Sequence, residues 1–144
     1  MIKVDIESSG DISDDVINTL YDATYFFIRQ LIPECARIRI DIIIDDDIEL
    51  RDEGYLGCIE VIKQHHYEIY IDESLDLDEM VISLAHELVH VKQYELRELV
   101  ELKNSALQWN GVFYSNALYN DAPWEKEAFE KERLLYESFS MLNK

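Results

Sequence analysis

Two histidines and a glutamate in the middle of the chain have the types and the spacing of a metal site. His86, Glu87 and His90 form the pattern H-E-x-x-H within a helical sequence. Four residues are slightly more than one helical turn, so both imidazoles project from one face of the helix, about 5.4 Å apart. That spacing lets both rings hold one zinc ion, with Glu87 beside them to take a proton from a zinc-activated water. The pattern is typical of metallopeptidases.

The surrounding periodicity predicts which way the histidines face. Apolar residues recur at helical spacing and form one narrow face of the predicted helix: Leu77, Val81, Leu84, Leu88 and Val91. His86 and His90 fall opposite that face, so they are expected to meet solvent or to line a cleft rather than to fill the core. The alternative is an exposed helix that carries a histidine pair by chance.

A catalytic zinc usually has three protein ligands and a water, so a third ligand is needed. No histidine follows His90, and Gln93 and Leu96 exclude the longer pattern H-E-x-x-H-x-x-G-x-x-H. A downstream carboxylate remains. Glu127 lies at the flank of the apolar face of the last predicted helix, where we expect it to turn inward. It is equally possible that Glu127 is an ordinary surface residue whose aliphatic stem packs against the helix face. The other glutamates of this helix are expected nearer solvent: Glu125, Glu130, Glu132 and Glu137.

Length and charge limit the class of protein. The 144 residues are enough for a single domain, residues 1–144, whose hydrophobic core needs no disulfide or structural metal to stabilise it. The net charge of -18 repels phosphate backbones and anionic lipids, so we expect neither nucleic acid nor membrane as a partner. Cys35 and Cys58 form no disulfide framework, and the N-terminus has no apolar signal region. No segment has the length of a membrane span. We therefore expect a soluble cytoplasmic protein with reduced thiols.

Patterning predicts an α+β order in which a helix and a small sheet precede the motif helix. Ser13 caps the first helix and Pro33 ends it, and Asp76 or Asp78 caps the motif helix. Trp109, Asn110, Gly111 and Val112 give a strong hairpin signal. Strands are expected at 2–6, 38–44, 55–62 and 67–71, and helices at 14–31, from the cap to about 102, and from about 120. The last helix has one apolar face: Trp124, Ala128, Leu135, Phe139 and Leu142.

The chain resembles a known clan at this point. The H-E-x-x-H at residues 86–90, followed by Pro-Trp-Glu-Lys-Glu-Ala at 123–128, is similar to the gluzincin metallopeptidases, above all to their small, single-domain, often phage-encoded members. The match covers roughly residues 81–136. It implies zinc bound by His86, His90 and Glu127, with Glu125 as the second choice. It also implies Glu87 as general base and a peptide or protein as substrate.

The resemblance also implies a zincin-like fold. Such a fold has a backing helix, a mixed sheet whose edge strand lies over the cleft, an active-site helix beneath it, a hairpin, and a C-terminal helix that carries the third ligand. The substrate is expected to lie extended along an edge strand within residues 55–62.

The chain departs from the larger gluzincins in two ways. It has no histidine after the third ligand to stabilise the oxyanion, and Lys131 stands where they place an aspartate that supports a ligand. Tyr114, Tyr119 and Arg97 are candidate substitutes, because a phenol or a guanidinium can donate to an oxyanion. Each also has a structural alternative, in packing for the tyrosines and in a surface ion pair for Arg97.

The missing histidine keeps a second function open, namely a non-catalytic zinc-binding regulatory or scaffolding protein on the same fold. A third possibility is a metal-free acidic protein that imitates nucleic acid by its charge. The oligomeric state stays open.

Overall fold

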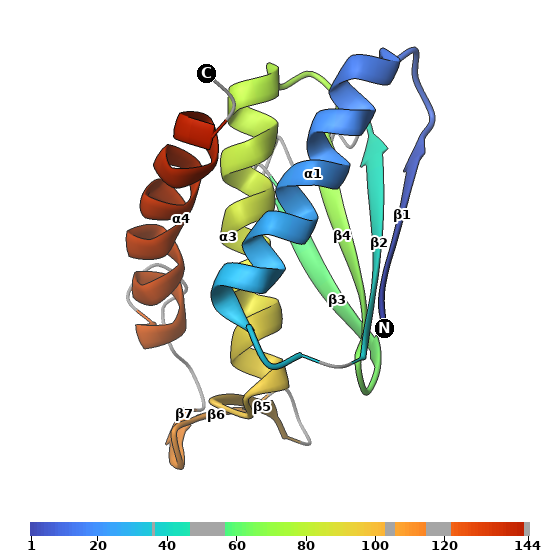
Figure 1. The fold of residues 1–144 in the computed structure, drawn as a ribbon. Helices are drawn as coiled ribbons and strands as arrows, with labels where there is room; N and C mark the ends of the chain where they lie inside the picture. Colours follow the sequence, from blue (N-terminus) through green and yellow to red (C-terminus); the bar gives the residue numbers. More distant parts are fainter. Residues whose placement is uncertain (36, 47–56, 103–105, 115–121, 143–144) are drawn as a thin grey trace.

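A computed structural model describes residues 1–35, 37–46, 57–102, 106–114 and 122–142. Within these ranges the chain forms helices and two sheets, so the expected α+β class is confirmed. Helices α1 (Asp14–Leu31) and α3 (Leu77–Glu95) cover one face of a four-stranded sheet, and α4 (Pro123–Leu142) packs along α3 (Figure 1). None of the described helices combines the length and the apolar character needed to cross a membrane.

The larger sheet has the order β1-β2-β4-β3. Its strands are β1 (Ile2–Ser8), β2 (Ile38–Asp45), β3 (Gly57–Lys63) and β4 (His66–Asp72). The first, second and fourth run parallel, whereas β3 is antiparallel and lies at the edge. An edge strand was expected within residues 55–62 and is confirmed for 57–62, since Tyr55 and Leu56 lie outside the described residues.

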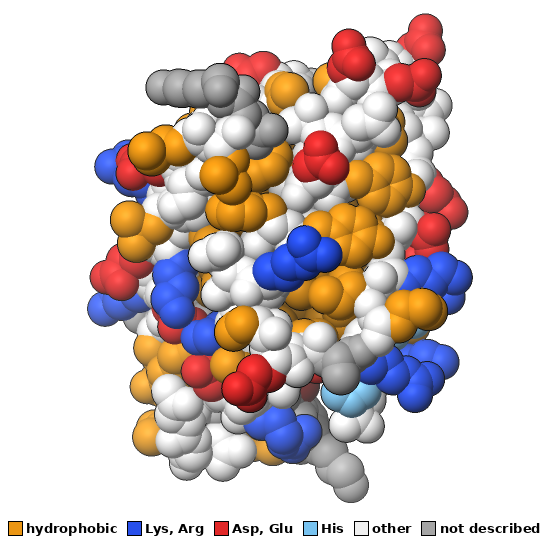
Figure 2. Space-filling view, viewed as in Figure 1, with side chains coloured by type: hydrophobic (Ala, Val, Ile, Leu, Met, Phe, Trp, Pro, Cys, Tyr) orange, Lys and Arg blue, Asp and Glu red, His pale blue; other side chains and the backbone are white. Residues whose placement is uncertain are grey.

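The core lies between this sheet and the helices. Alternate residues of β2 and β4 face inward and are fully buried: Ile38, Ile40, Ile42, Ile44, Tyr67, Ile69 and Ile71. Leu84 and Leu88 of α3 pack against them, as the periodicity predicted. Seen from the side of α1, hydrophobic side chains lie over the helices among charged side chains of both signs (Figure 2).

Both predicted N-caps are present. Ser13 accepts the amide of Val16 at the start of α1. Asp76 caps α3 and forms a capping box with Glu79, in which each side chain accepts the other residue's backbone amide. These caps fix the residues at which α1 and α3 begin.

The motif helix is shorter than expected, because α3 ends at Glu95 and not near residue 102. Arg97 has a φ of 56°, and the amides of Arg97 and Glu98 donate to the carbonyls of Tyr94 and Gln93. This pair of hydrogen bonds is the Schellman ending of a helix, which usually has glycine at the left-handed position. The following residues form β5 (Leu99–Glu101), which the periodicity analysis assigned to the helix.

The predicted hairpin is confirmed. Strands β6 (Leu107–Trp109) and β7 (Val112–Tyr114) flank Asn110 and Gly111, whose φ values of 47° and 87° fit a type I′ turn. Together with β5 they form a small antiparallel sheet. It packs on the first turn of α4 through Trp109 and Trp124, whose ring centroids are 6.3 Å apart.

Helix α4 buries most of its predicted apolar face. Trp124, Ala128, Leu135 and Phe139 are buried, but Leu142 is 68% exposed at the end of the helix. Phe139 packs against Phe26 and Phe27 of α1, with ring centroids 5.7 Å from both. These contacts hold α4 beside α3 along its length, and thereby position the glutamates of α4 relative to the motif.

Candidate metal centre

The two motif histidines lie between α3 and α4. Their ring centroids are 5.0 Å apart and their planes are inclined by 79°. The His86 side chain is 14% exposed and that of His90 only 4%, so neither extends freely into solvent. Both side chains therefore lie against α4 and not in open solvent.

A carboxylate of α4 meets both rings. Glu125 Oε1 lies 3.0 Å from His86 Nε2, and Glu125 Oε2 lies 3.0 Å from His90 Nε2. The Glu125 side chain is 2% exposed. One carboxylate therefore spans the gap between the two imidazoles, in a site from which water is largely excluded.

The expected third ligand, Glu127, is not the carboxylate that the structure places beside the histidines. The Glu127 carboxylate is 3.0 Å from Lys92 Nζ, 3.3 Å from Lys131 Nζ, and accepts the side-chain amide of Gln93 at 2.9 Å. It lies on the flank of α4 away from the two rings. Glu127 is thus part of an ion-pair network that joins the helices, and Glu125 is the carboxylate beside the histidines.

Helical geometry explains the error. At about 100° per residue, Glu125 and Glu127 fall on opposite flanks of the apolar face of α4, at similar angles from its centre. Periodicity alone cannot say which flank meets α3. The expectation that Glu125 and Glu132 point toward solvent was wrong for the same reason, since both contact His86.

The outer nitrogen of each imidazole is also engaged. His86 Nδ1 lies 3.0 Å from Glu132 Oε2, and His90 Nδ1 lies 2.8 Å from Gln93 Oε1. The Gln93 side-chain NH₂ donates to the carbonyl of Trp124 at 2.9 Å, so its oxygen must face His90. His90 Nδ1 therefore carries a proton, and its Nε2 faces Glu125.

The residues present fit a divalent cation. His90 Nε2 is buried and, among the described residues, has no aligned hydrogen-bond partner, although Glu125 Oε2 is near. Ligand atoms of His86, Glu87 and His90 lie within 4.8 Å of one another. Two imidazole nitrogens and a carboxylate are a donor set that zinc accepts, and a carboxylate or amide on the outer nitrogen is the usual support for a ligating histidine.

The site strongly favours positive charge between the rings. Burial disfavours a charged His86, but its hydrogen bonds to Glu125 and Glu132 outweigh burial and raise its pKa to about 10. Burial likewise opposes a charged Glu125, yet its close contacts with His86 and His90 lower its pKa to about 2. The carboxylates therefore form a negatively charged cradle around the nitrogens.

Glu87 occupies a different environment from Glu125. Its Cγ lies beside Gly57 of β3 and the residue is 4% exposed. Burial raises its pKa although His90 and His86 act to lower it. A carboxylate with a raised pKa is suited to taking up and returning a proton. Glu87 is thus a buried carboxylate beside the nitrogen cluster, with a raised pKa.

Gly57 is a site residue that sequence reasoning missed. A Cβ at Gly57 would lie 2.6 Å from Ser83 Oγ, 2.8 Å from the carbonyl oxygen of Tyr70, and 3.7 Å from Glu87 Cγ. The edge strand can approach α3 this closely only because the residue has no side chain. The available signal was a glycine within a predicted strand, in a chain that has few glycines.

The candidate oxyanion stabilisers are not brought together with the histidines. Arg97 lines a cavity beyond the end of α3, and Tyr114 packs edge-on against Trp124 at 5.4 Å. Tyr119 lies outside the described residues. Tyr94, a residue not considered from sequence, follows His90 by one turn. Burial and Glu101 raise its pKa most, and Glu125 and Glu87 add to the effect, so its phenol lies within electrostatic reach of the site.

Comparison with protein-family models, curated proteins and solved structures gave no match to this chain.

Proposed function

We propose that this protein is a zinc-dependent peptidase of gluzincin type. The observation that carries the proposal is the convergence of His86, His90 and Glu125 on one buried point, with an orphaned imidazole nitrogen facing it. The arrangement of α1, β3, α3 and α4 supports a zincin-like fold. The sheet supplies an edge strand beside the motif helix, and α4 supplies the third ligand.

His86, His90 and Glu125 would hold the ion, while Glu132 and Gln93 fix the orientation of the two rings. When bound, zinc supplies Lewis acidity, which makes water nucleophilic near neutral pH and polarises a carbonyl. Glu87 accepts the proton of the attacking water and returns it to the leaving amine. Its raised pKa suits both steps, because the carboxylate must be a base first and an acid afterwards.

The substrate would pair with β3 in an extended conformation. The outer edge of β3 is not paired with another described strand, and Gly57 brings this edge against α3 beside Glu87. Backbone hydrogen bonds along the edge would hold a peptide independently of most of its sequence. The scissile carbonyl would then lie between the edge strand and the nitrogen cluster.

The test combines metal content with turnover. We expect stoichiometric zinc in purified wild-type protein and in Glu87→Gln, and loss of zinc in Glu125→Ala. Wild-type protein should cleave members of a broad peptide library, and Glu87→Gln should cleave none while keeping its zinc. Cleavage by Glu87→Gln at the wild-type rate would refute the assigned base. Full zinc in Glu125→Ala would refute the ligand set.

A non-catalytic zinc-binding protein is the second candidate. It is favoured by the positions of Arg97 and Tyr114, neither of which contacts the histidines in the part of the chain that the structure describes. Zinc bound tightly by His86, His90 and Glu125, together with no cleavage of any library peptide by the zinc-loaded wild type, would select this function.

A further inference from the structure

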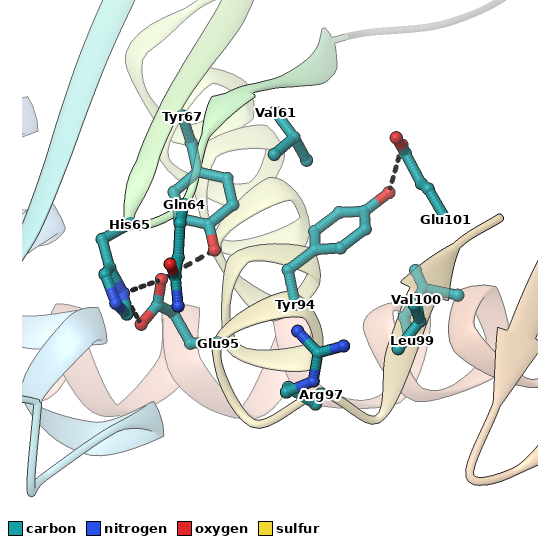
Figure 3. A pocket seen from close by; sticks show the side chains of 10 residues that line it. All are labelled: Val61, Gln64, His65, Tyr67, Tyr94, Glu95, Arg97, Leu99, Val100 and Glu101. Atoms are coloured by element: carbon teal, nitrogen blue, oxygen red, sulfur yellow. Dashed lines mark hydrogen bonds and ion pairs between the residues drawn. The ribbon is translucent and has the colours of Figure 1, made fainter. Parts of the chain in front are cut away.

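A cavity lies at the end of α3, beyond the nitrogen cluster. Its volume is about 420 Å³, and it opens between the edge strand β3, the last turn of α3 and the strand β5 (Figure 3). The residues that line it include Val61, Tyr67, Tyr94, Glu95, Arg97 and Glu101.

The cavity continues the line of the proposed substrate. Gly57, Ile59 and Val61 pair with buried residues of β4, so these alternate positions of β3 face α3. Gly57 lies beside Glu87, and Val61 lines the cavity. On α3, Tyr94 follows Glu87 by seven residues, about 10 Å along the axis. A peptide paired with β3 would therefore pass from Glu87 to the mouth of the cavity.

Hydrogen-bond acceptors dominate the polar wall. The Tyr67 hydroxyl donates to Glu95 at 2.7 Å, and His65 Nδ1 lies 2.8 Å from the same carboxylate. The Tyr94 hydroxyl donates to Glu101 at 3.1 Å. Both phenol hydroxyl groups thus donate to carboxylates, and each phenol oxygen can still accept a hydrogen bond. Figure 3 shows both carboxylates directed toward the tyrosines.

The apolar wall has an aromatic face. The rings of Tyr67 and Tyr94 are stacked, with centroids 6.1 Å apart and an interplanar angle of 27°. Glu95 is 8% exposed at its side chain, so its charge lies in a poorly solvated place. Arg97 also lines the cavity, on the side of β5. Such a wall packs a long aliphatic stem and accepts hydrogen bonds at its end.

We propose that this cavity is a subsite for a lysine or arginine side chain of an extended peptide or protein substrate, with Glu95 and Glu101 facing the cation. The inference rests on the proposed function for its substrate class. The net charge of -18 acts in the same direction, because it raises the local concentration of basic peptides and repels acidic ones.

Binding can be measured without turnover. Short labelled peptides that differ at a single position, Lys, Gln, norleucine or Glu, are titrated by fluorescence anisotropy into zinc-loaded Glu87→Gln. The variable position is moved along the peptide. We expect the lysine peptide to bind about three- to tenfold more tightly than the glutamine peptide at one position only, and the difference to shrink with added salt.

Matched variants locate the effect. Glu101→Gln keeps an acceptor for Tyr94 and should remove most of the lysine preference. Glu101→Lys should shift the preference toward the glutamate peptide. Glu130→Gln makes the same change of charge on the exposed face of α4 and should leave the preference intact. A preference for the glutamate or norleucine peptide in the parent protein, or a lysine preference unchanged by Glu101→Gln, would overturn the subsite.

Failure of the subsite can be told from failure of the proposed function. Cleavage of library peptides with no enrichment of lysine or arginine at a fixed distance from the cut would retain the peptidase and discard the subsite. Position-specific, Glu101-dependent binding of basic peptides without any cleavage would retain the subsite and discard the peptidase. Absence of binding by every peptide in the set would overturn the subsite.

Discussion

Glu132 Oε2 lies 3.0 Å from His86 Nδ1, on the side of the imidazole opposite Glu125. Glu132 stands seven residues after Glu125, two turns along the same helix, so α4 supplies both partners of one ring.

Glu132→Gln should weaken metal binding by roughly 10- to 100-fold without unfolding the protein, because the ring loses the partner that orients it and raises its basicity. Competition with a chromophoric zinc chelator measures the change. Glu130→Gln removes the same charge from the exposed face of α4 and is therefore the control for loss of charge. Equal losses in both variants would show a general electrostatic effect and not a specific contact.

Glu125→Ala and Glu127→Ala should have opposite consequences. The first should abolish stoichiometric zinc binding, because it removes the carboxylate between the rings. The second should retain zinc but lower the free energy of unfolding by about 1–3 kcal/mol, because Lys92, whose side chain is 8% exposed, loses one of its two partners. Elemental analysis and urea unfolding in chelator distinguish the two effects. Zinc lost from Glu127→Ala alone would reverse the assignment.

Gly57→Ala should displace the edge strand, since the added methyl group would meet Ser83 Oγ and the backbone of Tyr70. We expect a loss of about 1–3 kcal/mol in the free energy of unfolding, a normal zinc content and reduced peptide turnover. Adding Ser83→Ala should recover only part of the stability, because the carbonyl of Tyr70 stays in place. Full recovery in the double variant would show that the backbone contact is unimportant.

The metal-free protein should owe part of its stability to the pair of His86 and Glu125, within a limited pH window. The pKa of His86 is raised to about 10, so its contribution is complete below the unfolded value of 6.5 and is lost as pH rises toward 10. The pKa of Glu125 is lowered to about 2, so its contribution is present above 4.5 and is lost as pH falls toward 2.

The stability advantage of wild type over Glu125→Gln, measured in chelator by urea unfolding, should therefore be greatest between pH 4.5 and 6.5 and shrink on both sides. Glu130→Gln should show no such window. An advantage that grows steadily up to pH 10 would contradict the raised pKa of His86.

Much of the fold follows from local signals. Ser13 and Asp76 set the helix starts, Asn110 and Gly111 set the hairpin, and period-two patterning set the strands. The end of α3 escaped prediction because Arg97 occupies a left-handed position that usually carries glycine. The apolar residues of β5 then continue the helical period by coincidence. Local propensity gave way to a tertiary pairing of Leu99 with Trp109.

The candidate site likewise has one part that local sequence predicts and one part that depends on tertiary packing. His86, Glu87 and His90 lie on a single helix, so helical spacing alone determines their relation. Glu125 and Glu132 reach them from another helix, and their choice depends on how α4 is rotated against α3. That rotation is determined by contacts far from the histidines, such as Phe139 with Phe26 and Phe27, which no pairwise spacing in the sequence encodes.

The side-chain amide of Gln93 touches His90, the Trp124 carbonyl and Glu127 at once. No other residue type offers one acceptor and two protons at that reach, so glutamate or leucine at this position would cost the chain several bonds together. The orientation of the His90 ring and the docking of α4 on α3 therefore depend on the same side chain.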